Sequence, residues 1–284
     1  MQNLFEAANE HPLFRKFKIS DVLFTEYKCL AEAPIFDIWS AHNYFVYVVT
    51  GKKQWNTRQA EYMVYKGELI FVKKGANIIH KFFDEGFCAL LIFMPDDYIR
   101  DVLKPHPAAF THVKEETTDS VLPVSLDNTL HAYFQSLSAY FFRTEALSPT
   151  LLEIKFRELL LNLTSSEFHS GLGAYFKSLF YNTRTSIPSI MEANFTYNLS
   201  LEEFATLCNR SLSVFKADFK EIYDCSPGRW LTQKRLEYAR TLLVNTDKMV
   251  TELAFECGFE NASHFTRVFK EKYGVTPLQS RKVY

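Results

Sequence analysis

Residues 258–270 read GFENASHFTRVFK and residues 209–220 read NRSLSVFKADFK, so one pattern occurs twice near the end of the chain. Equivalent residues after the start of each stretch are 50 positions apart, whereas those before it are 49 apart. A helix, a sharp turn and a second helix, present twice and with one extra residue at the turn of the second copy, account for this spacing. The equivalent pairs are Glu203 and Glu252, Ala205 and Ala254, Cys208 and Cys257, Asn209 and Gly258, Phe215 and Phe265, Phe219 and Phe269, Lys220 and Lys270, Glu221 and Glu271, Tyr223 and Tyr273, Ser226 and Thr276, and Pro227 and Pro277.

Signals at the ends of the predicted helices agree with the repeat. Ser200 opens a capping box with the Glu three residues later, and Ser211 and Asn261 are suited to cap the second helix of each copy. Asn209 and Gly258 occupy the turns, where Gly adopts positive φ freely and Asn tolerates it. Two such units suit a domain that places two helices in the major groove of DNA.

A further helix is predicted between the two copies. Ser226 followed by Pro227 is a typical helix start, and apolar residues recur at helical spacing through Asn245. At about 1.5 Å per residue, this helix is long enough to hold two DNA-reading units about one turn of DNA apart. The recurring apolar residues are Trp230, Leu231, Tyr238, Leu242 and Leu243.

The second helix of each copy has an aromatic face, which predicts core, and an opposite face of small, hydroxyl or cationic residues. The aromatic faces comprise Leu212, Phe215, Phe219 and Tyr223 in the first copy, and Phe265, Val268, Phe269 and Tyr273 in the second. The opposite faces supply the candidate DNA-binding residues, which are Ser213, Lys216, Ala217 and Lys220 in the first copy, and Ser263, His264, Thr266, Arg267 and Lys270 in the second.

From about residue 186 to 284 the sequence resembles the AraC/XylS transcriptional regulators, most closely over 258–270 and the following Tyr-Gly-Val-Thr-Pro of 273–277. The resemblance implies a DNA-binding domain at 184–284, double-stranded promoter DNA and RNA polymerase as partners, and a homodimer that acts as an activator. Departures are few: Asn209 and Asp224 replace glycines, and both residue types tolerate left-handed backbone angles. Met249 stands where a capping Ser or Thr is common, which leaves Asp247 as a substitute cap.

The candidate residues have different expected roles. Their positions around the helix, together with the family resemblance, place Lys216 and Arg267 on the faces expected to contact DNA bases. Lys220 and Lys270 are either phosphate contacts or ordinary solvated lysines. His264 reads a base, contacts phosphate or faces solvent. The small residues Ser213, Ala217, Ser263 and Thr266 let a helix approach the base edges.

Charge gives this interpretation no independent support. Residues 186–284 contain 13 basic and 12 acidic side chains, and the whole chain has a net charge of −1. A basic patch is the usual footprint of a DNA-binding protein, so here it has to come from local arrangement.

Composition predicts about two folded domains in a cytoplasmic protein. The 284 residues are 47% hydrophobic, with 27 Phe and 15 Tyr. The amino terminus lacks the pattern of a signal peptide, and no apolar stretch is long enough to span a membrane. The five cysteines are odd in number and form no C-x-x-C motif, which indicates free thiols in a reducing compartment.

Residues 1–125 are predicted to be rich in β-structure. Runs of strand-forming residues at 44–50, 67–75 and 87–94 end at Gly or Pro. The pattern is similar to the cupin-like amino-terminal domain of AraC-type regulators, which implies a β-barrel that senses a small molecule or a protein. The dibasic turn Lys73-Lys74 also resembles that of family members that govern type III secretion and respond to protein partners. The aromatic residues of this region either line an effector pocket or form a core.

No catalytic, cofactor or metal site is expected. Enzymatic cupins bind a metal through a His-x-His pair, a carboxylate and a later His, whereas here only His42 and His80 lie near such places. Two separated imidazoles do not make an open three-ligand site.

Residues 126–183 are predicted to be helical. The apolar stripes fall in 130–141, in 151–163 (Leu151, Leu152, Ile154, Leu159, Leu160 and Leu163) and in 176–180. The family resemblance implies dimer contacts here; the alternative is that the stripes only cover the barrel. The polar segment 182–186 is the expected linker.

These observations predict an α+β protein with a cupin-like β-barrel sensor domain at 1–125, a helical dimerisation region at 126–183 and an all-helical domain with two helix-turn-helix motifs at 184–284. The expected function is sequence-specific transcription regulation under the control of an effector. The two alternatives are a cupin-type enzyme with an appended helical domain and an architectural DNA-binding protein.

Overall fold

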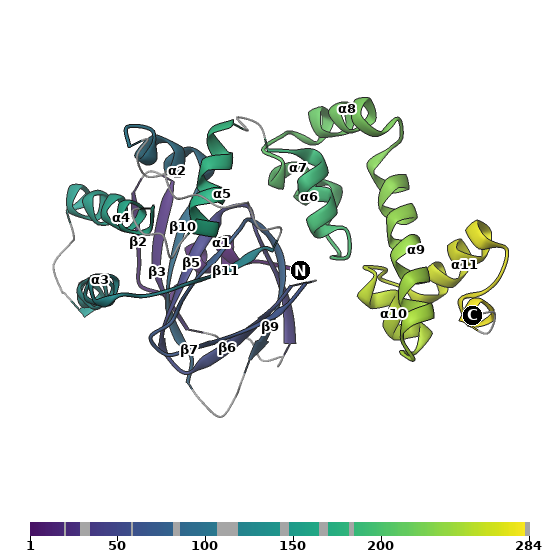
Figure 1. Ribbon diagram of the computed structural model, residues 1–284, viewed down its shortest axis with the longest axis horizontal. Helices are drawn as coiled ribbons and strands as arrows, with labels where there is room; N and C mark the ends of the chain where they lie inside the picture. Colours follow the sequence, from purple (N-terminus) through teal and green to yellow (C-terminus); the bar gives the residue numbers. More distant parts are fainter. Residues whose placement is uncertain are drawn as a thin grey trace. The chain divides into compact units, whose positions relative to one another are not determined.

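The computed structural model describes residues 1–19, 21–28, 35–57, 59–81, 86–106, 119–142, 148–164, 170–181 and 185–281. The chain forms two compact units, Met1–Thr183 and Arg184–Tyr284. The first is built on β-sheets and the second is helical, so the predicted α+β class is confirmed (Figure 1). No helix among the described residues is long and apolar enough to cross a membrane.

The strands of the first unit form two sheets, and no ladder among the described strands joins one sheet to the other, so a closed barrel is not observed. Gly51, with φ of +75°, ends β5 and lets the chain turn directly into β6 of the other sheet. In spatial order, the first sheet contains β1 (Gln2–Asn3), β4 (Ile35–Ser40), β9 (Gly75–Lys81), β6 (Lys52–Asn56) and β7 (Glu61–Tyr65), and the second contains β11 (Val121–Val124), β8 (Leu69–Val72), β5 (Asn43–Thr50), β10 (Cys88–Met94), β3 (Val22–Lys28) and β2 (Lys16–Ile19).

The central strands of the second sheet are buried on both faces, which explains their continuous apolar sequences. On β5, Val46 and Val48 point into the core between the sheets, whereas Phe45 points into a second core beneath helices. The predicted strands at 44–50, 67–75 and 87–94 are therefore confirmed as β5, β8 and β10.

Helices cover the outer face of this sheet (Figure 1). The apolar stripe at 130–141 is buried, but Leu151 and Ile154 are 37% and 55% exposed, so the stripe at 151–163 is narrower than predicted. In the first unit the helices are α1 (Leu4–Glu10), α2 (Asp96–Leu103), α3 (Asn128–Ser138), α4 (Pro149–Thr164) and α5 (Ser170–Tyr181), with a 3-10 turn at Ala139–Phe142.

The second unit contains the two predicted helix-turn-helix motifs on either side of a long helix. Residues 182–184 of the expected linker lie outside the described residues, and Ser186 caps the first helix of this unit by accepting a hydrogen bond from the Ser189 amide. The helices are α6 (Ile187–Asn194), α7 (Leu201–Leu207), α8 (Leu212–Tyr223), α9 (Pro227–Asn245), α10 (Val250–Glu256), α11 (Ala262–Tyr273) and α12 (Pro277–Arg281).

Candidate nucleic-acid interface

The first helix-turn-helix motif comprises α7 and α8. The Ser200 capping box is confirmed: its hydroxyl accepts from the Glu203 amide, and the Glu203 carboxylate accepts from the Ser200 amide. Asn209 adopts φ of +54° at the turn, and Ser211 caps α8. This motif begins and ends where the sequence predicted.

Arg210, which the sequence analysis did not single out, braces this turn. Its guanidinium donates to the Asp218 carboxylate at 2.8 Å and to the carbonyl oxygens of Cys208 at 2.7 Å and Thr185 at 2.8 Å. Its position directly after the turn residue Asn209 was the available signal. These bonds tie the turn to α8 and to the start of the unit, which fixes how α8 is presented.

The second motif, α10 and α11, repeats this plan with one change at the cap. Met249 is the cap residue of α10, and the Glu252 carboxylate accepts from its amide at 3.0 Å. The prediction that Asp247 serves as the cap is therefore wrong, because Met249 is the residue that directly precedes the helix. Gly258 has φ of +85°, and the Asn261 side chain caps α11.

The aromatic faces of α8 and α11 are core, as predicted. Phe215, Phe219, Phe265 and Phe269 are fully buried, and the rings of the two pairs lie 5.7 and 5.6 Å apart. The tyrosines that follow are half-buried. The buried aromatic residues hold α8 and α11 in place, with the opposite face of each helix turned outward.

Trp230, predicted to be core, is half-buried at the start of α9. Its ring packs on Phe219 and Tyr223 of α8 at 6.0 and 5.4 Å. The middle and end of α9 pack on the second motif through Leu236, Ala239 and Leu243. This one helix therefore contributes to the cores of both motifs.

The structure gathers the candidate residues into two equivalent surfaces. Ser213, Lys216, Ala217 and Lys220 form the α8 face, and all four are exposed. They are spaced i, i+3, i+4 and i+7, so they share one side of the helix. Lys216 and Lys220 make no ion pair within the described part of the chain, which leaves their ammonium groups available to an anion.

Ser263, Thr266, Arg267 and Lys270 form the α11 face at the same spacing, 50 residues on. Thr266 is half-buried, and its hydroxyl donates to the Ala262 carbonyl at 2.8 Å, so its methyl group is the part left to make a contact. Arg267 is 63% exposed and forms an ion pair with Glu271 at 2.8 Å. This exposed pair is weak and screened by salt, so Arg267 can exchange it for a DNA contact.

His264 is exposed but stands beside this face. Its ring packs edge-on to Phe259 with centroids 6.0 Å apart, which draws it toward the turn. The structure thus brings eight of the nine candidate residues onto two helix faces and places His264 at the margin of one.

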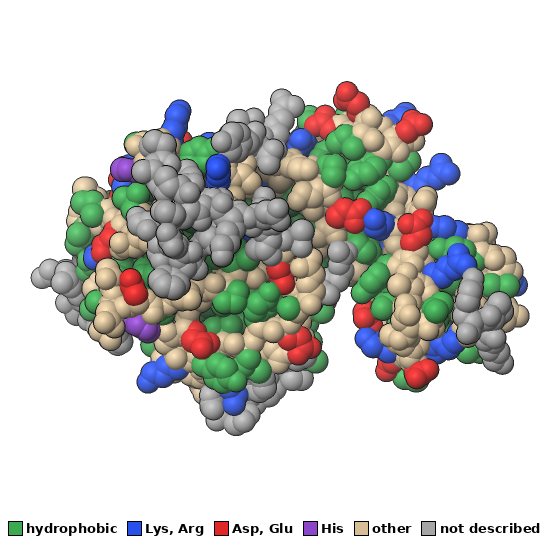
Figure 2. Space-filling view, viewed as in Figure 1, with side chains coloured by type: hydrophobic (Ala, Val, Ile, Leu, Met, Phe, Trp, Pro, Cys, Tyr) green, Lys and Arg blue, Asp and Glu red, His purple; other side chains and the backbone are tan. Residues whose placement is uncertain are grey.

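Basic side chains do not form one continuous surface on the view in Figure 2, where Lys and Arg alternate with Asp and Glu over the carboxy-terminal unit. Several cations are paired, including Lys272 with Glu237 and Lys248 with Glu256. The exposed cations of the two faces, Lys216 and Lys220 on α8 and Arg267 and Lys270 on α11, rather than net charge, distinguish these surfaces.

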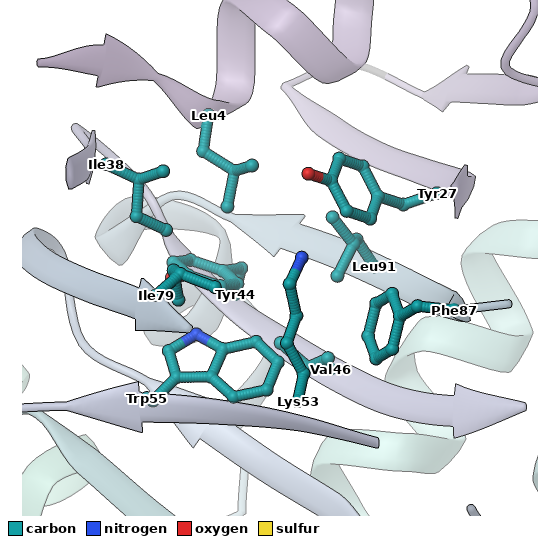
Figure 3. A pocket seen from close by; sticks show the side chains of 10 residues that line it. All are labelled: Leu4, Tyr27, Ile38, Tyr44, Val46, Lys53, Trp55, Ile79, Phe87 and Leu91. Carbon is teal, nitrogen blue, oxygen red and sulfur yellow. The ribbon is translucent and has the colours of Figure 1, made fainter. Parts of the chain in front are cut away.

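Among the described residues, the cavity between the two sheets of the amino-terminal unit is too small for an effector. A cavity of about 10 Å³ lies between the sheets, lined by apolar side chains and by Lys53, whose ammonium lies over the rings of Tyr27 and Phe87 at 4.9 and 4.5 Å (Figure 3). The Tyr44 hydroxyl and the Trp55 indole nitrogen are buried here, close to each other. A space of this size holds about one water molecule.

His42 and His80 are the two histidines that the sequence analysis considered as metal ligands. His42 lies in the turn before β5, with its ring against Phe5 at 4.3 Å, and burial lowers its pKa. His80 belongs to β9, and its side chain is outside the described part of the structure. Among the described residues, no three His, Cys, Asp or Glu side chains are grouped to hold a metal ion.

Comparison with known proteins identifies both units. Residues 43–175 match the family described as ExsA N-terminal regulatory domain, and residues 204–282 match the family described as helix-turn-helix domain. The virulence regulon transcriptional activator VirF of Yersinia enterocolitica is 25% identical over 251 residues, which cover 87% of this chain and 92% of VirF. The transcriptional regulator ExsA of Pseudomonas aeruginosa is 24% identical over 220 residues, covering 76% of this chain and 77% of ExsA.

Among solved structures, that of ToxT from Vibrio cholerae aligns with 93% of this chain and 98% of its own, at 14% identity and a TM-score of 0.40. The family matches place a regulatory domain before a DNA-binding helix-turn-helix domain, and the full-length relatives share that order. This chain is therefore a member of the AraC family of transcriptional regulators, and it is not an enzyme.

Proposed function

We propose that this chain activates transcription by placing the α8 face and the α11 face in successive major grooves of promoter DNA. The observation that carries the proposal is the equivalence of these two surfaces, each exposed, cationic and seated on a buried aromatic core. Small residues on both faces let the helix backbones approach the base edges. The names of the relatives, which include a virulence regulon transcriptional activator, support activation rather than repression.

Within each face, the position of a residue along the helix suggests whether it contacts bases or phosphates. Lys216 and Arg267 lie at the centre of the faces and read bases, since Arg pairs well with guanine. Lys220 and Lys270 lie one turn later and neutralise phosphates. Ser213, Ala217, Ser263 and Thr266 make close contact with base edges, and His264 contacts the flanking backbone.

We infer that the amino-terminal unit is a cupin-like sensor at 1–125, since its two packed sheets match the double-sheet arrangement of cupins. Because the cavity between the sheets among the described residues holds only about one water molecule, we place the effector on the surface. A groove of about 430 Å³ runs between β7, β8, β11 and the start of α3, and includes Tyr62, Glu68, Pro123 and His131. It is large enough for a small molecule or for part of a protein partner.

Dimerisation is assigned to the helical region at 126–183. The buried residues of α3 and α4 cover the second sheet, which accounts for most of the apolar pattern. Leu151 and Ile154 remain exposed on the outer side of α4 and are the contacts we propose for a second copy. Ile154→Glu should shift the chain from dimer to monomer in analytical ultracentrifugation, whereas Glu153→Gln, on the same exposed surface, should not.

The regulator acts in the cytoplasm, where promoter-bound copies contact RNA polymerase. The DNA-binding domain spans 184–284, and a fragment of residues 186–284 should fold alone and protect the same half-sites as the intact chain. It should need more protein to do so, because the upstream region no longer links two copies. An insoluble fragment beside an active intact chain would show that residues 1–185 complete the DNA-binding core.

The decisive experiment is a genome-wide footprint of the bound protein, followed by binding assays on the recovered sites. A specific activator should bind its site about a thousandfold or more tightly than random DNA at physiological salt. A chain with Lys216→Ala and Arg267→Ala together should lose most of this preference. Equal binding to promoter and random DNA would instead indicate an architectural DNA-binding protein.

A further inference from the structure

The two helix-turn-helix motifs are joined by more than the shared helix α9. The clamp segment, residues 195–199, connects α6 to α7, the first helix of the first motif, and it lies against the turn of the second motif. Arg235 of α9 holds this segment: its Nε donates to the Phe195 carbonyl at 2.6 Å and its terminal nitrogen donates to the Tyr197 carbonyl at 2.8 Å.

The clamp segment also contacts the turn of the second motif directly. A Cβ on Gly258 would lie 2.6 Å from the Thr196 carbonyl oxygen, so only glycine allows the two backbones to approach this closely. Beside this contact, the Asn198 side chain donates to the Glu260 carboxylate at 2.7 Å. Two segments 62 residues apart in sequence are therefore held together by backbone packing and a side-chain hydrogen bond.

Side chains around Arg235 strengthen the attachment of the clamp segment to α9. The Phe195 ring packs edge-on to Tyr238 with centroids 5.7 Å apart, and Lys234 pairs with Glu192 of α6 at 2.6 Å. Burial lowers the pKa of Arg235 to about 10, so the guanidinium keeps its charge at neutral pH. Its loss would remove one hydrogen-bond donor from each of two half-buried carbonyl groups.

Without these contacts, the relative position of α8 and α11 would depend on α9 alone. The first motif holds α9 through its first turns, at Trp230, and the second holds it from Leu236 onward. Each of these cores is small, so each motif could rock on the common helix. The clamp segment closes a second connection and resists that motion.

We propose that Arg235 is a positioning residue that fixes the spacing and orientation of the two DNA-reading helices through the clamp segment. This inference rests on the proposed two-groove binding. A rigid pair of reading helices matches one distance between contacted grooves, whereas a loosely joined pair tolerates several distances at lower affinity. Arg235 thereby determines which arrangements of half-sites the protein accepts, although it touches no base.

The test compares binding of the full-length chain to its footprinted site and to the same duplex with one base pair inserted between the two contacted grooves. The insertion rotates one groove by about a tenth of a turn. The unaltered protein should lose about tenfold or more in affinity, equivalent to one full base contact. Arg235→Met should bind the original site about tenfold more weakly and distinguish the two duplexes by only about twofold.

Lys272→Gln is the matched control. Lys272 also carries one positive charge and donates to α9, at Glu237 and the Gln233 carbonyl, but this contact lies within the second motif. The control should weaken binding to both duplexes equally and keep the full discrimination between them. A general effect of lost charge or stability would give the same result for both variants.

The inference is overturned if Arg235→Met is as heat-stable as the unaltered protein and distinguishes the two duplexes equally well. That result would show that α9 alone sets the spacing. If Arg235→Met does not fold, Asn198→Ala decides, because it removes only the exposed bond to Glu260; it should reduce discrimination to about threefold, and full discrimination counts against the clamp. A footprint of the unaltered protein that covers only one groove would instead refute the proposed two-groove binding itself.

Discussion

The carbonyl oxygen of Thr196 lies 2.6 Å from the position that a Cβ would take on Gly258. The equivalent turn residue of the first motif is Asn209, which is exposed and has a similar left-handed conformation, with φ of +54° against +85°. The two copies thus need the same backbone angle, but the second also needs the absence of a side chain.

This difference predicts effects of different size for the two reciprocal substitutions. Gly258→Asn should destabilise the second unit by about 1–3 kcal/mol, because Asn accepts the backbone angle but its Cβ collides with the clamp segment. Asn209→Gly should change stability by less than about 1 kcal/mol, through the unfolded state. Thermal unfolding of the full-length chain, followed by far-UV circular dichroism, measures both. Equal effects at the two positions would mean that the close approach at Thr196 does not matter.

The repeat made the carboxy-terminal unit predictable because its determinants are local. Caps, turn residues and apolar spacing act within a few residues, and all of them lie in the sequence at fixed intervals. Asp224 and Gly274 illustrate this: both end a recognition helix in the left-handed conformation, as the alignment of the two copies predicted. The contact of Thr196 with Gly258 is not local, and no pattern indicated it.

The amino-terminal unit was less predictable for the same reason. Strand positions follow from apolar runs and breakers, but which strands pair depends on long-range contacts, so two sheets could not be distinguished from a closed barrel. Lys74 is a further example. In the sequence it is half of a dibasic turn, whereas in the structure it is 8% exposed because Asp96, 22 residues later, pairs with it.

The buried pair of Lys74 and Asp96 provides a second prediction. Their charged groups lie 2.6 Å apart, and the Asp96 carboxylate also accepts from Asn43 at 2.7 Å. Asn43 in turn accepts from the Tyr175 hydroxyl at 2.7 Å, which links α5 to the sheet. Asp96→Asn should destabilise the first unit by about 3–5 kcal/mol, because the ammonium stays buried without this carboxylate.

The neighbouring lysine is the control for that prediction. Lys73 lies over the Tyr175 ring at 4.8 Å and is half-buried, so Lys73→Met should cost only about 0.5–1 kcal/mol. Replacing Lys74 with Met and Asp96 with Leu together should recover only part of the loss, since an apolar pair needs no desolvation of charge but removes the acceptor of the buried Asn43 amide. Chemical denaturation measures all three. A loss for Asp96→Asn no larger than for Lys73→Met would contradict the assigned importance of the pair.

A third prediction concerns Lys220 and Lys270, which end the α8 and α11 faces. Both are exposed and follow a fully buried Phe. Replacing either with Ala should weaken binding to all DNA sequences alike and lower the slope of log affinity against log salt by about one unit. Titrations at several salt concentrations measure the slope. An unchanged slope would return both residues to ordinary solvated lysines.

The last prediction concerns Arg267, whose guanidinium is held at 2.8 Å from Glu271 in the free protein. Both side chains are exposed, so the pair contributes little and opens when DNA supplies a better acceptor. Arg267→Ala should weaken binding to the cognate site by about 1–3 kcal/mol and relax base preference at one or two positions. Binding to a library of single-base site variants measures the preference.

Glu271→Gln is the informative partner of this variant, because it removes the acceptor but leaves Arg267 in place. It should tighten binding to cognate and random DNA alike, since an acidic group near the phosphates is lost and the guanidinium no longer has to leave an ion pair. Base preference should not change. If Arg267→Ala instead weakens binding to cognate and random DNA equally, Arg267 contacts a phosphate, and the reading of bases by α11 has to be reassigned to Ser263, His264 and Thr266.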